Sequence, residues 1–295
     1  HTGMLASARH PVDPMERAFH QLFPADDAGQ GASALIHRFG LRPDLLAVTH
    51  VWALDGDEAA EAIATSEHLL INFPHNPTGA LIDHAQLATL VTHCEASGTR
   101  LIADEVFRGL EHSEHATLAP VATLTARGVS IGSLAKPHGA GGVRIGWMVS
   151  QDTALLTRAV EIRRTLSVCS GTTDEWLARL ILEHSQPLRA ASLQRLKHHV
   201  GIIEESLPAL DGRLTWTRPE AGCVAFPLIA LGDGFDQRCL SETGIMLIPQ
   251  RCFVGCAEAG REGAQKTLAG GIRLGYGLAD FPETWARFVD FLAHA

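Results

Sequence analysis

Three short apolar runs, each ending in a polar side chain or a turn, constrain the fold more than any other feature of this chain. The runs lie near residues 69–73, 100–104 and 129–132. Segments at 82–97 and 153–165 lie between and after them and predict helices. Continuous apolar runs are typical of strands buried on both faces, and their alternation with helices indicates βαβ units. The pattern therefore predicts an α/β fold with a mostly parallel sheet.

A second structural unit is expected toward the C-terminus. A long helix is predicted over residues 174–206, and a last helix over 282–293. We therefore expect a large domain over residues 1–190 and a smaller α/β domain over residues 191–295. The strands of the smaller domain are expected near residues 213–217, 222–226, 245–248 and 271–275.

Polar groups follow two of the apolar runs. Asp104 closes the run Leu-Ile-Ala, at the strand edge where open α/β sheets bind ligands. A carboxylate there can pair with a protonated pyridine nitrogen, although for a single Asp after a strand a helix cap or a surface salt bridge is the more usual explanation. Asn76 lies in INFPHNPTG, whose two prolines and Gly79 predict a rigid turn. Its amide can contact a ring hydroxyl, and Asn-Pro is also ordinary turn chemistry.

The stretch SLAKPHGAGGVRIGW combines a lysine with a serine and an arginine. Ser133 precedes Lys136 by three residues, and Arg144 follows it by eight. The serine and the arginine can hold a phosphate while the lysine amine reaches a carbonyl carbon. A lysine that forms a Schiff base must be partly desolvated or lie near other cations, as pyridoxal phosphate requires. The alternative is a solvated glycine-rich loop with two basic residues.

Together the three segments resemble the fold-type I pyridoxal-phosphate enzymes, in particular the class I/II aminotransferase family. They match its landmarks in order and approximate spacing, and the resemblance runs from about residue 24 to the end. It implies a three-layer α/β/α large domain like that of aspartate aminotransferase, pyridoxal 5'-phosphate as cofactor, and a homodimer. The substrates it implies are an L-amino acid and a 2-oxo acid.

The resemblance also implies a role for each landmark. Lys136 matches the lysine that forms the Schiff base with the cofactor. Asp104 matches the partner of the pyridine nitrogen, and Asn76 matches the ligand of the phenolic oxygen. Ser133 and Arg144 match phosphate ligands. By this resemblance the chain is a transaminase in which the lysine moves a proton after the substrate amine has released it.

Two further positions bear on the substrate and the reaction. Arg273 in GGIRLGYG matches the substrate-carboxylate arginine, and a guanidinium can bind a carboxylate in a bidentate pair. By itself it would be an ordinary strand-edge arginine. Phe107 stands where the family usually has a tyrosine that binds the phenolic oxygen, and some relatives that carry out elimination, cyclisation or oxidation also have phenylalanine there. LSVCSGTTDEWLARLIL and DEVFRGLEHS suggest the subgroup of capreomycidine synthase and arginine-processing enzymes, so the alternative reaction is elimination, cyclisation or oxidation of an arginine-like amino acid.

Other positions depart from the family. Its N-terminal stretch, with a helix N-terminus that cradles the phosphate, has no match here, so we expect an N-terminally short large domain. Where a ring-stacking group is expected, QLFPADD offers Asp26 or Asp27, and neither can stack. A catalytically inactive scaffold is therefore the second alternative. Five residues that match the family argue against an inactive scaffold, namely Asn76, Asp104, Lys136, Arg144 and Arg273.

Composition limits the other classes of protein to which the chain could belong. The net charge of -9 argues against nucleic acid as a partner, and no apolar run approaches the ~20 residues that span a bilayer, so we expect a cytoplasmic protein. Six cysteines lack a C-x-x-C pair and no ligand set has zinc spacing, so we expect no metal. Of the histidines, His198 and His199 are expected to face solvent, whereas His75 and His138 flank site residues.

Overall fold

The computed structural model describes most of the chain after residue 65. The described residues are 66–113, 116–229, 234–253 and 270–294, with short pieces at 42–43, 52–53, 59–60, 63–64 and 232. Asp26 and Asp27 lie outside the described residues. Ahead of residue 66 two short strands, β1 (Arg42–Pro43) and β2 (Trp52–Ala53), pair antiparallel.

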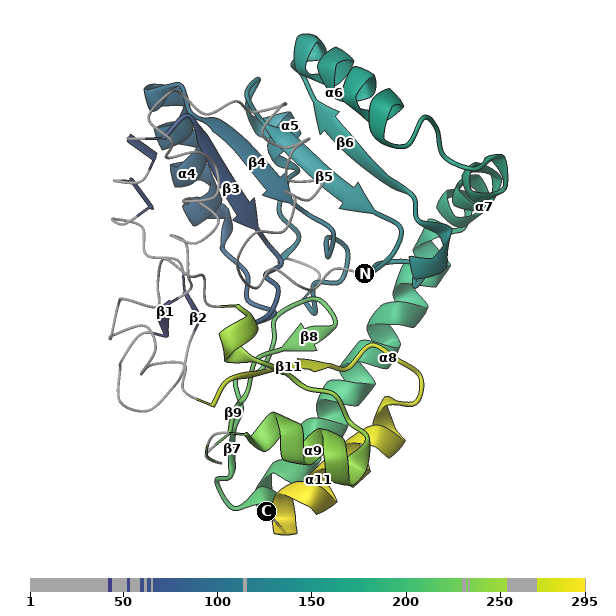
Figure 1. Cartoon of the computed structure of the whole chain (residues 1–295). Helices are drawn as coiled ribbons and strands as arrows, with labels where there is room; N and C mark the ends of the chain where they lie inside the picture. Colours follow the sequence, from purple (N-terminus) through teal and green to yellow (C-terminus); the bar gives the residue numbers. More distant parts are fainter. Residues whose placement is uncertain are drawn as a thin grey trace.

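A four-stranded sheet carries the first half of the described chain (Figure 1). Its order is β3-β4-β5-β6, with β3, β4 and β5 parallel and β6 antiparallel to β5. The prediction of a mostly parallel sheet is therefore confirmed. The sequence did not predict β6, because it is a half-exposed edge strand with few buried apolar residues. The strands are β3 (His68–Asn72), β4 (Arg100–Asp104), β5 (Val129–Ser133) and β6 (Gly146–Ser150).

Helices cover both faces of this sheet. Leu69 and Leu101 face one side, where they pack with α4 and α5. Ile102 faces the other side, where it packs with Leu155 of α6. Because successive strand residues point to opposite faces, the strands need apolar partners on both sides. The three-layer α/β/α arrangement is confirmed. The covering helices are α4 (His84–Ser97), α5 (Val121–Leu124) and α6 (Thr153–Leu166).

The two longer covering helices begin at aspartate caps. The Asp83 carboxylate accepts a hydrogen bond from the Gln86 N–H at 2.7 Å, and the Gln86 side chain accepts from the Asp83 N–H. This capping box moves the helix start from the expected residue 82 to His84. Asp152 caps α6 through the Leu155 N–H and also pairs with Arg100 of β4 at 2.9 Å.

The second half of the chain forms a smaller α/β unit. The expected single helix over 174–206 is wrong, because the backbone at His184 leaves the helical region and divides it into α7 (Thr172–Glu183) and α8 (Ser185–Ser206). Strands β10, β11 and β8 form an antiparallel sheet, and β7 pairs with β9. The remaining elements are η2 (Gly141–Val143), η3 (Leu207–Leu210), β7 (Leu214–Thr215), β8 (Val224–Ala225), β9 (Leu228–Ile229), α9 (Phe235–Thr243), β10 (Ile248–Pro249), η4 (Gln250–Cys252), β11 (Ile272–Gly275) and α11 (Phe281–His294).

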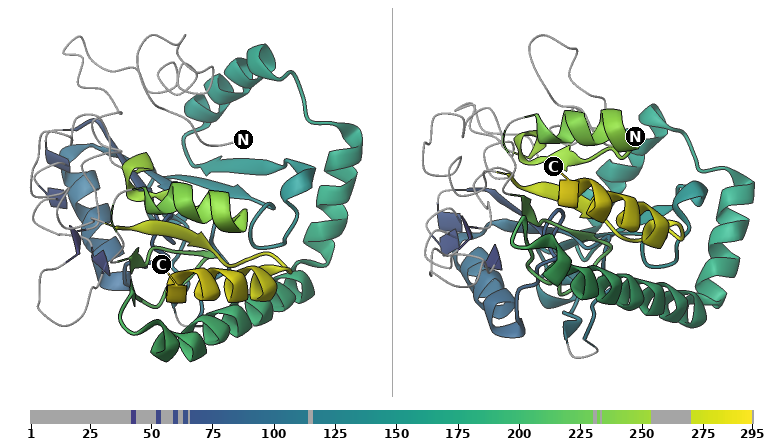
Figure 2. Two further views of the ribbon diagram at one scale, coloured as in Figure 1. Left: turned by 60° about the horizontal axis from the view of Figure 1, so that its bottom comes forward. Right: turned by 90° about the horizontal axis from the view of Figure 1, so that it is seen from below.

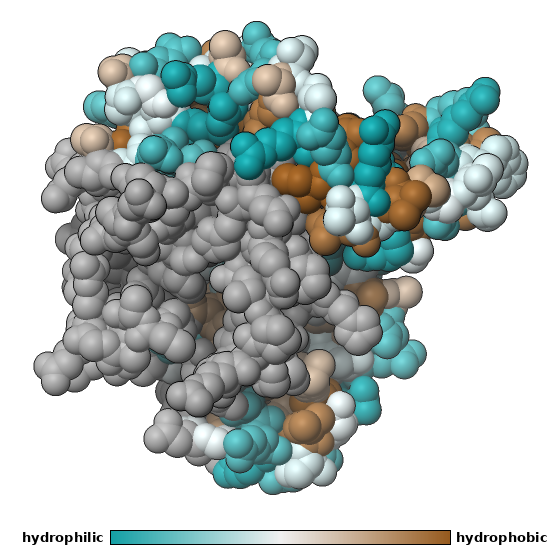
Figure 3. All heavy atoms as spheres, turned by 45° about the horizontal axis from the view of Figure 1, so that its top comes forward, coloured by the Kyte–Doolittle hydropathy of each residue, from teal (hydrophilic) through white to brown (hydrophobic). Residues whose placement is uncertain are grey.

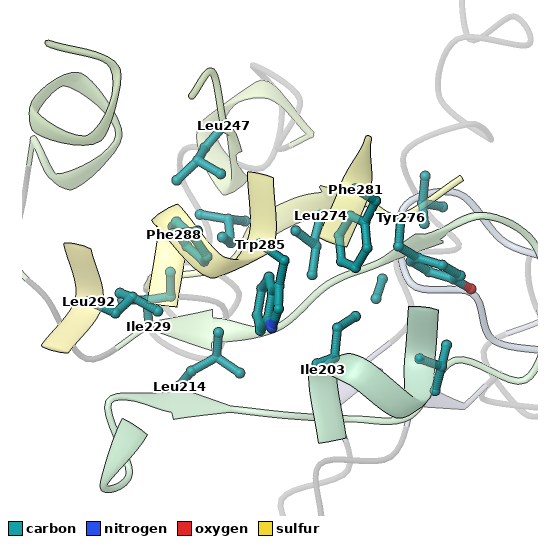
Figure 4. Packing of buried hydrophobic residues seen from close by; sticks show 14 of the residues in the cluster. Ile203, Leu214, Ile229, Leu247, Leu274, Tyr276, Phe281, Trp285, Phe288 and Leu292 are labelled. Carbon is teal, nitrogen blue, oxygen red and sulfur yellow. The ribbon is translucent and has the colours of Figure 1, made fainter. Parts of the chain in front are cut away.

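The largest apolar cluster lies between α8, α11 and the sheet of this unit (Figure 4). Helix α11 runs beside α8 (Figure 2). His199 of α8 is buried in this region and its Nδ1 lies 2.7 Å from the Tyr276 carbonyl oxygen, so the expectation that it faces solvent is wrong. Phe107 and Leu110, from the loop after β4, belong to the same cluster. The two units are therefore joined by shared packing.

The predicted domain division at residue 190 falls inside α8. The first turns of this helix lie near the large sheet, and its last turns lie in the apolar cluster of the smaller unit (Figure 1). A division there would cut a continuous helix, and the predicted boundary stays a prediction.

Phe288 provides a test of the cluster. Its side chain is 2% exposed on α11, so Phe288→Ala should lower the free energy of unfolding by about 3–5 kcal/mol through the lost apolar burial and the cavity left behind. Urea unfolding followed by circular dichroism measures the change. Leu240→Ala on α9 is the matched control, because that side chain is 49% exposed and its loss should cost about 0.5 kcal/mol or less. Equal losses in the two variants would contradict this packing.

Candidate active site

Asn72 and Asp104 lie side by side at the carboxyl edge of the sheet. They are paired in the parallel register of β3 and β4, and the Asn72 side chain donates a hydrogen bond to the Asp104 carbonyl oxygen at 3.5 Å. The Asn72 Oδ1 accepts a second hydrogen bond from the Asn76 N–H at 2.7 Å. One amide therefore joins the end of β4 to the Asn-Pro turn. Asn72 was not predicted as a site residue, although its place at the end of an apolar run is the same signal that marked Asp104.

The Asp104 carboxylate is a partly buried acid without a cationic partner among the described residues. Its Oδ1 accepts a hydrogen bond from the Val106 N–H at 3.1 Å. Burial raises the pKa of Asp104, and the hydrogen bonds from Val106 and Asn72 oppose this only in part. An ionised Asp104 would be stabilised by a cation at this edge.

The Asn-Pro turn is held against the smaller unit by its closing glycine. Gly79 has φ of +73°, and a side chain added there would place a Cβ 2.5 Å from the Cβ of Pro219. The Gly79 carbonyl oxygen accepts hydrogen bonds from the N–H groups of Glu220 and Ala221 at 2.9 and 3.0 Å. Only glycine combines this conformation with such a close approach. The turn that carries Asn76 is thereby positioned by residues from the second half of the chain.

His75 is a neutral part of the same turn. Its Nδ1 lies 2.8 Å from the Thr78 hydroxyl oxygen. Burial lowers the pKa of His75 to about 4, so the ring carries no charge at neutral pH. We therefore assign it to the turn structure.

Arg273 reaches from β11 to this turn. Its Nη1 donates a hydrogen bond to the Asn76 Oδ1 at 3.4 Å, and its guanidinium carbon lies 5.7 Å from the centre of the Phe253 ring. The contact joins residues 197 positions apart. The structure thus brings together the amide and the guanidinium that the sequence analysis assigned to the phenolic oxygen and the substrate carboxylate.

Lys136 lies across from the loop that follows β4. Its Nζ is 5.7 Å from the centre of the Phe107 ring, within the range of a cation–π contact, and the lysine is exposed. Phe107 itself is buried, with Gly222 of the smaller unit beside its ring. A phenylalanine here packs and faces the amine but offers no hydroxyl.

Cys223 lies within electrostatic range of Lys136 and Arg273 and was missed as a site residue. Burial raises the pKa of its thiol, and the positive charges of Lys136 and Arg273 oppose that shift. The thiol therefore lies close enough to feel the charges of both residues that the sequence placed in one site. The spacing of cysteines contains no signal for this position.

Ser133 and Arg144 lie near the connection between β5 and β6. The Ser133 hydroxyl donates to the Ile145 carbonyl oxygen at 3.3 Å and accepts from the Ala135 N–H at 3.1 Å. Arg144 is exposed, and its Nη1 donates to the Gly141 carbonyl oxygen at 3.0 Å. Among the described contacts, none joins the Arg144 guanidinium to Ser133 or Lys136. Their role as phosphate ligands stays a prediction.

The described part of the chain offers neither a metal site nor a membrane-spanning helix. No group of three or more histidine, cysteine or acidic side chains within it could hold a metal ion. No helix within the same residues is long and apolar enough to cross a membrane.

Comparison with known sequences identifies relatives over most of the chain. The family described as aminotransferase class I and II matches residues 40–263. Capreomycidine synthase of Streptomyces vinaceus is 31% identical over 244 residues, which cover 80% of this chain and 59% of that protein. An arginine–pyruvate transaminase of Pseudomonas aeruginosa is 27% identical over 219 residues, which cover 72% and 52%. The chain thus spans less than two thirds of the length of these relatives.

Solved structures show the same fold. A PLP-dependent aminotransferase from Streptococcus suis superposes with a TM-score of 0.71 at 24% identity, over 82% of this chain and 61% of that one. The PLP-dependent cyclase OrfR superposes with a TM-score of 0.68 at 25% identity, over 81% and 63%. The aspartate aminotransferase-like fold and the family match together establish what the landmark residues suggested. This chain belongs to the class I and II aminotransferase family.

Proposed function

We propose that this protein is a pyridoxal-phosphate-dependent aminotransferase that exchanges the amino group of an L-amino acid with a 2-oxo acid. The observation that carries the proposal is a partly buried acid, Asp104, without a described cationic partner, at the sheet edge that also carries Asn76. Lys136 and Arg273 complete the set of candidate site residues, and the Cys223 thiol feels the charge of both. The relatives include several transaminases, which supports the same reaction class.

The residues fit pyridoxal phosphate. A protonated pyridine nitrogen is the kind of cation that would stabilise an ionised Asp104, and an exposed lysine amine can form the covalent attachment. Asn76 has an amide that can contact a ring hydroxyl, while Ser133 and Arg144 would hold the phosphate. When bound, this cofactor supplies an electron sink for the charge that develops at the substrate Cα.

Side chains of the protein bind the substrate and move the proton. Arg273 orients the substrate by its carboxylate, and the hydrogen bond with Asn76 positions the guanidinium before the substrate arrives. The Lys136 amine, once free, accepts the proton from the substrate Cα as a general base. The buried Phe107 ring offers this amine an apolar surface at 5.7 Å. Orientation by Arg273 decides which bond at Cα is broken.

Phe107 favours a second candidate reaction. A phenylalanine at this position cannot donate a hydrogen bond to a ring hydroxyl, and it faces the lysine amine at 5.7 Å. The relatives include capreomycidine synthase, a cyclase of known structure and transaminases named for arginine or its derivatives. The second candidate is therefore elimination, cyclisation or oxidation of an arginine-like amino acid. Conversion of an added 2-oxo acid into its amino acid distinguishes the two, because only transamination passes the amino group to an acceptor.

We also propose a cytoplasmic homodimer. The five described cysteines form no disulfide, as expected in a reducing compartment. Apolar side chains are exposed on one part of the molecule, which Figure 3 shows in part, and such patches are typical of interfaces. These side chains, on β6, α6, α7 and the residues between the two helices, are Trp147, Val149, Val160, Leu166, Val168, Trp176 and Leu182.

Lys136→Ala tests the proposed chemistry. In the unmodified protein, borohydride should fix added pyridoxal phosphate on the peptide that contains Lys136, and amino acids should change the absorbance. The alanine variant should lose this fixation while its circular dichroism stays unchanged, because the lysine is exposed and removing it leaves no cavity. Lys197→Ala on α8, also an exposed lysine, is the matched control. An unmodified protein that binds no cofactor at saturating concentration would favour the inactive scaffold.

Asp104→Asn should separate stability from cofactor binding. Because burial raises the pKa of Asp104 in the folded state, its ionisation lowers stability as the pH rises toward and through that pKa. The cofactor-free variant should therefore unfold at a higher urea concentration than the unmodified protein at pH 7, and the difference should shrink as the pH falls through the raised pKa of Asp104 and vanish below about 4. Cofactor affinity should fall by at least about tenfold, because the charged partner is lost. A variant of unchanged affinity would contradict the role of Asp104.

The dimer is tested at the exposed apolar face. Light scattering should give the unmodified protein twice the mass of its 31.6 kDa chain, and Trp176→Asp should shift it toward a single chain. Leu278→Asp is the control, because Leu278 is also an exposed apolar residue but lies outside this face. It should leave the mass unchanged. A monomeric unmodified protein, or a dimer unaffected by Trp176→Asp, would refute the proposed interface.

A further inference from the structure

The beginning of α8 contacts the turn that carries the lysine. His138, two residues after Lys136, lies with its Nε2 2.8 Å from the hydroxyl oxygen of Ser185, the first residue of the helix. The turn is closed by a hydrogen bond from the Gly139 N–H to the Lys136 carbonyl oxygen at 3.2 Å. The lysine backbone and the histidine therefore belong to one short turn, and a contact that holds the ring also limits where the lysine can lie.

One helical turn later, α8 contacts the loop that carries Phe107. A Cβ added to Gly109 would lie 2.7 Å from the Nε and Nη2 atoms of Arg189, so this guanidinium packs directly on the glycine backbone. Gly109 has φ of +89°, a conformation that L side chains rarely adopt. Ser185 and Arg189 thus place one helix against both loops between which the lysine amine and the Phe107 ring face each other.

Burial, with a smaller contribution from Arg189, keeps His138 neutral. The His138 Nδ1 and the Arg189 Nε are both buried without a hydrogen-bond partner among the described residues. Burial and the nearby Arg189 lower the pKa of His138, so the ring is neutral. Because Nδ1 has no partner among the described residues, the contact between Nε2 and the Ser185 hydroxyl is the described hydrogen bond that holds the ring.

We propose that His138 is a positioning residue that, through its hydrogen bond to Ser185, holds the Lys136 turn against α8 and so sets the position of the lysine amine. The inference rests on the proposed attachment of the cofactor to Lys136. His138 does not touch the reacting atoms and acts only through the turn. Because the later residues Leu196, Val200 and Ile203 of α8 lie in the apolar cluster of the smaller unit, the helix also links the turn to that unit.

The experiment follows attachment of pyridoxal phosphate to the full chain by absorbance. Measurements are made on the unmodified protein, His138→Phe, Ser185→Ala and the double variant. Each single variant should attach the cofactor about threefold to tenfold more slowly, the range that one neutral hydrogen bond supports. The double variant should be no slower than the slower single variant, because both changes remove the same interaction. His93→Phe on the exposed side of α4 is the matched control and should attach at the unmodified rate.

A conservative variant separates positioning from general damage. His138→Gln keeps an N–H donor near the position of Nε2 and should restore most of the rate, whereas a merely structural role of the ring would leave it as slow as phenylalanine. Ser185→Ala keeps the inference testable if His138→Phe does not fold.

The outcomes distinguish the two proposals. Unchanged rates in both single variants, or effects that multiply in the double variant, would overturn the positioning role while leaving the proposed function intact. Failure of the unmodified protein to attach the cofactor would overturn the proposed function and this inference with it.

Discussion

The parallel pairing of β3 with β4 is the constraint on which the rest of the site depends. It places Asn72 beside Asp104 at one edge of the sheet, and the Asn72 amide then connects the end of β4 to the Asn-Pro turn. A register shifted by one residue would exchange the faces of β4 and turn its apolar side chains away from α4. The burial of Leu69 and Leu101 therefore protects the geometry of the polar edge.

The smaller unit contributes the residues of the candidate site that do not come from the sheet edge. Gly79 fits against Pro219 without room for a side chain, and Gly222 lies beside the Phe107 ring. These close approaches bring Arg273 of β11 to Asn76 of the turn. The candidate site thus depends on packing between the large sheet and the smaller unit. Phe107 takes part in both, because it belongs to the apolar cluster of the smaller unit and its ring faces Lys136.

Much of this could be predicted from local pattern. Apolar runs near 69–73, 100–104 and 129–132 correspond to β3, β4 and β5, because strands buried on both faces need continuous apolar residues. The edge strand β6 and helix α9 were not predicted, since half-exposed elements lack that pattern. The break at His184 was also missed, because the residues on either side favour a helix.

By itself the sequence determined the fold class, the family and the identity of the landmark residues, because motif order and apolar periodicity are properties of the chain alone. Tertiary structure decided which groups meet. Only folding places Cys223 near Lys136 and Arg273, lowers the pKa of His75 to about 4 by burial, and joins His138 to Ser185. These contacts join residues far apart in the chain or depend on burial, and neither distance nor desolvation can be read from local spacing.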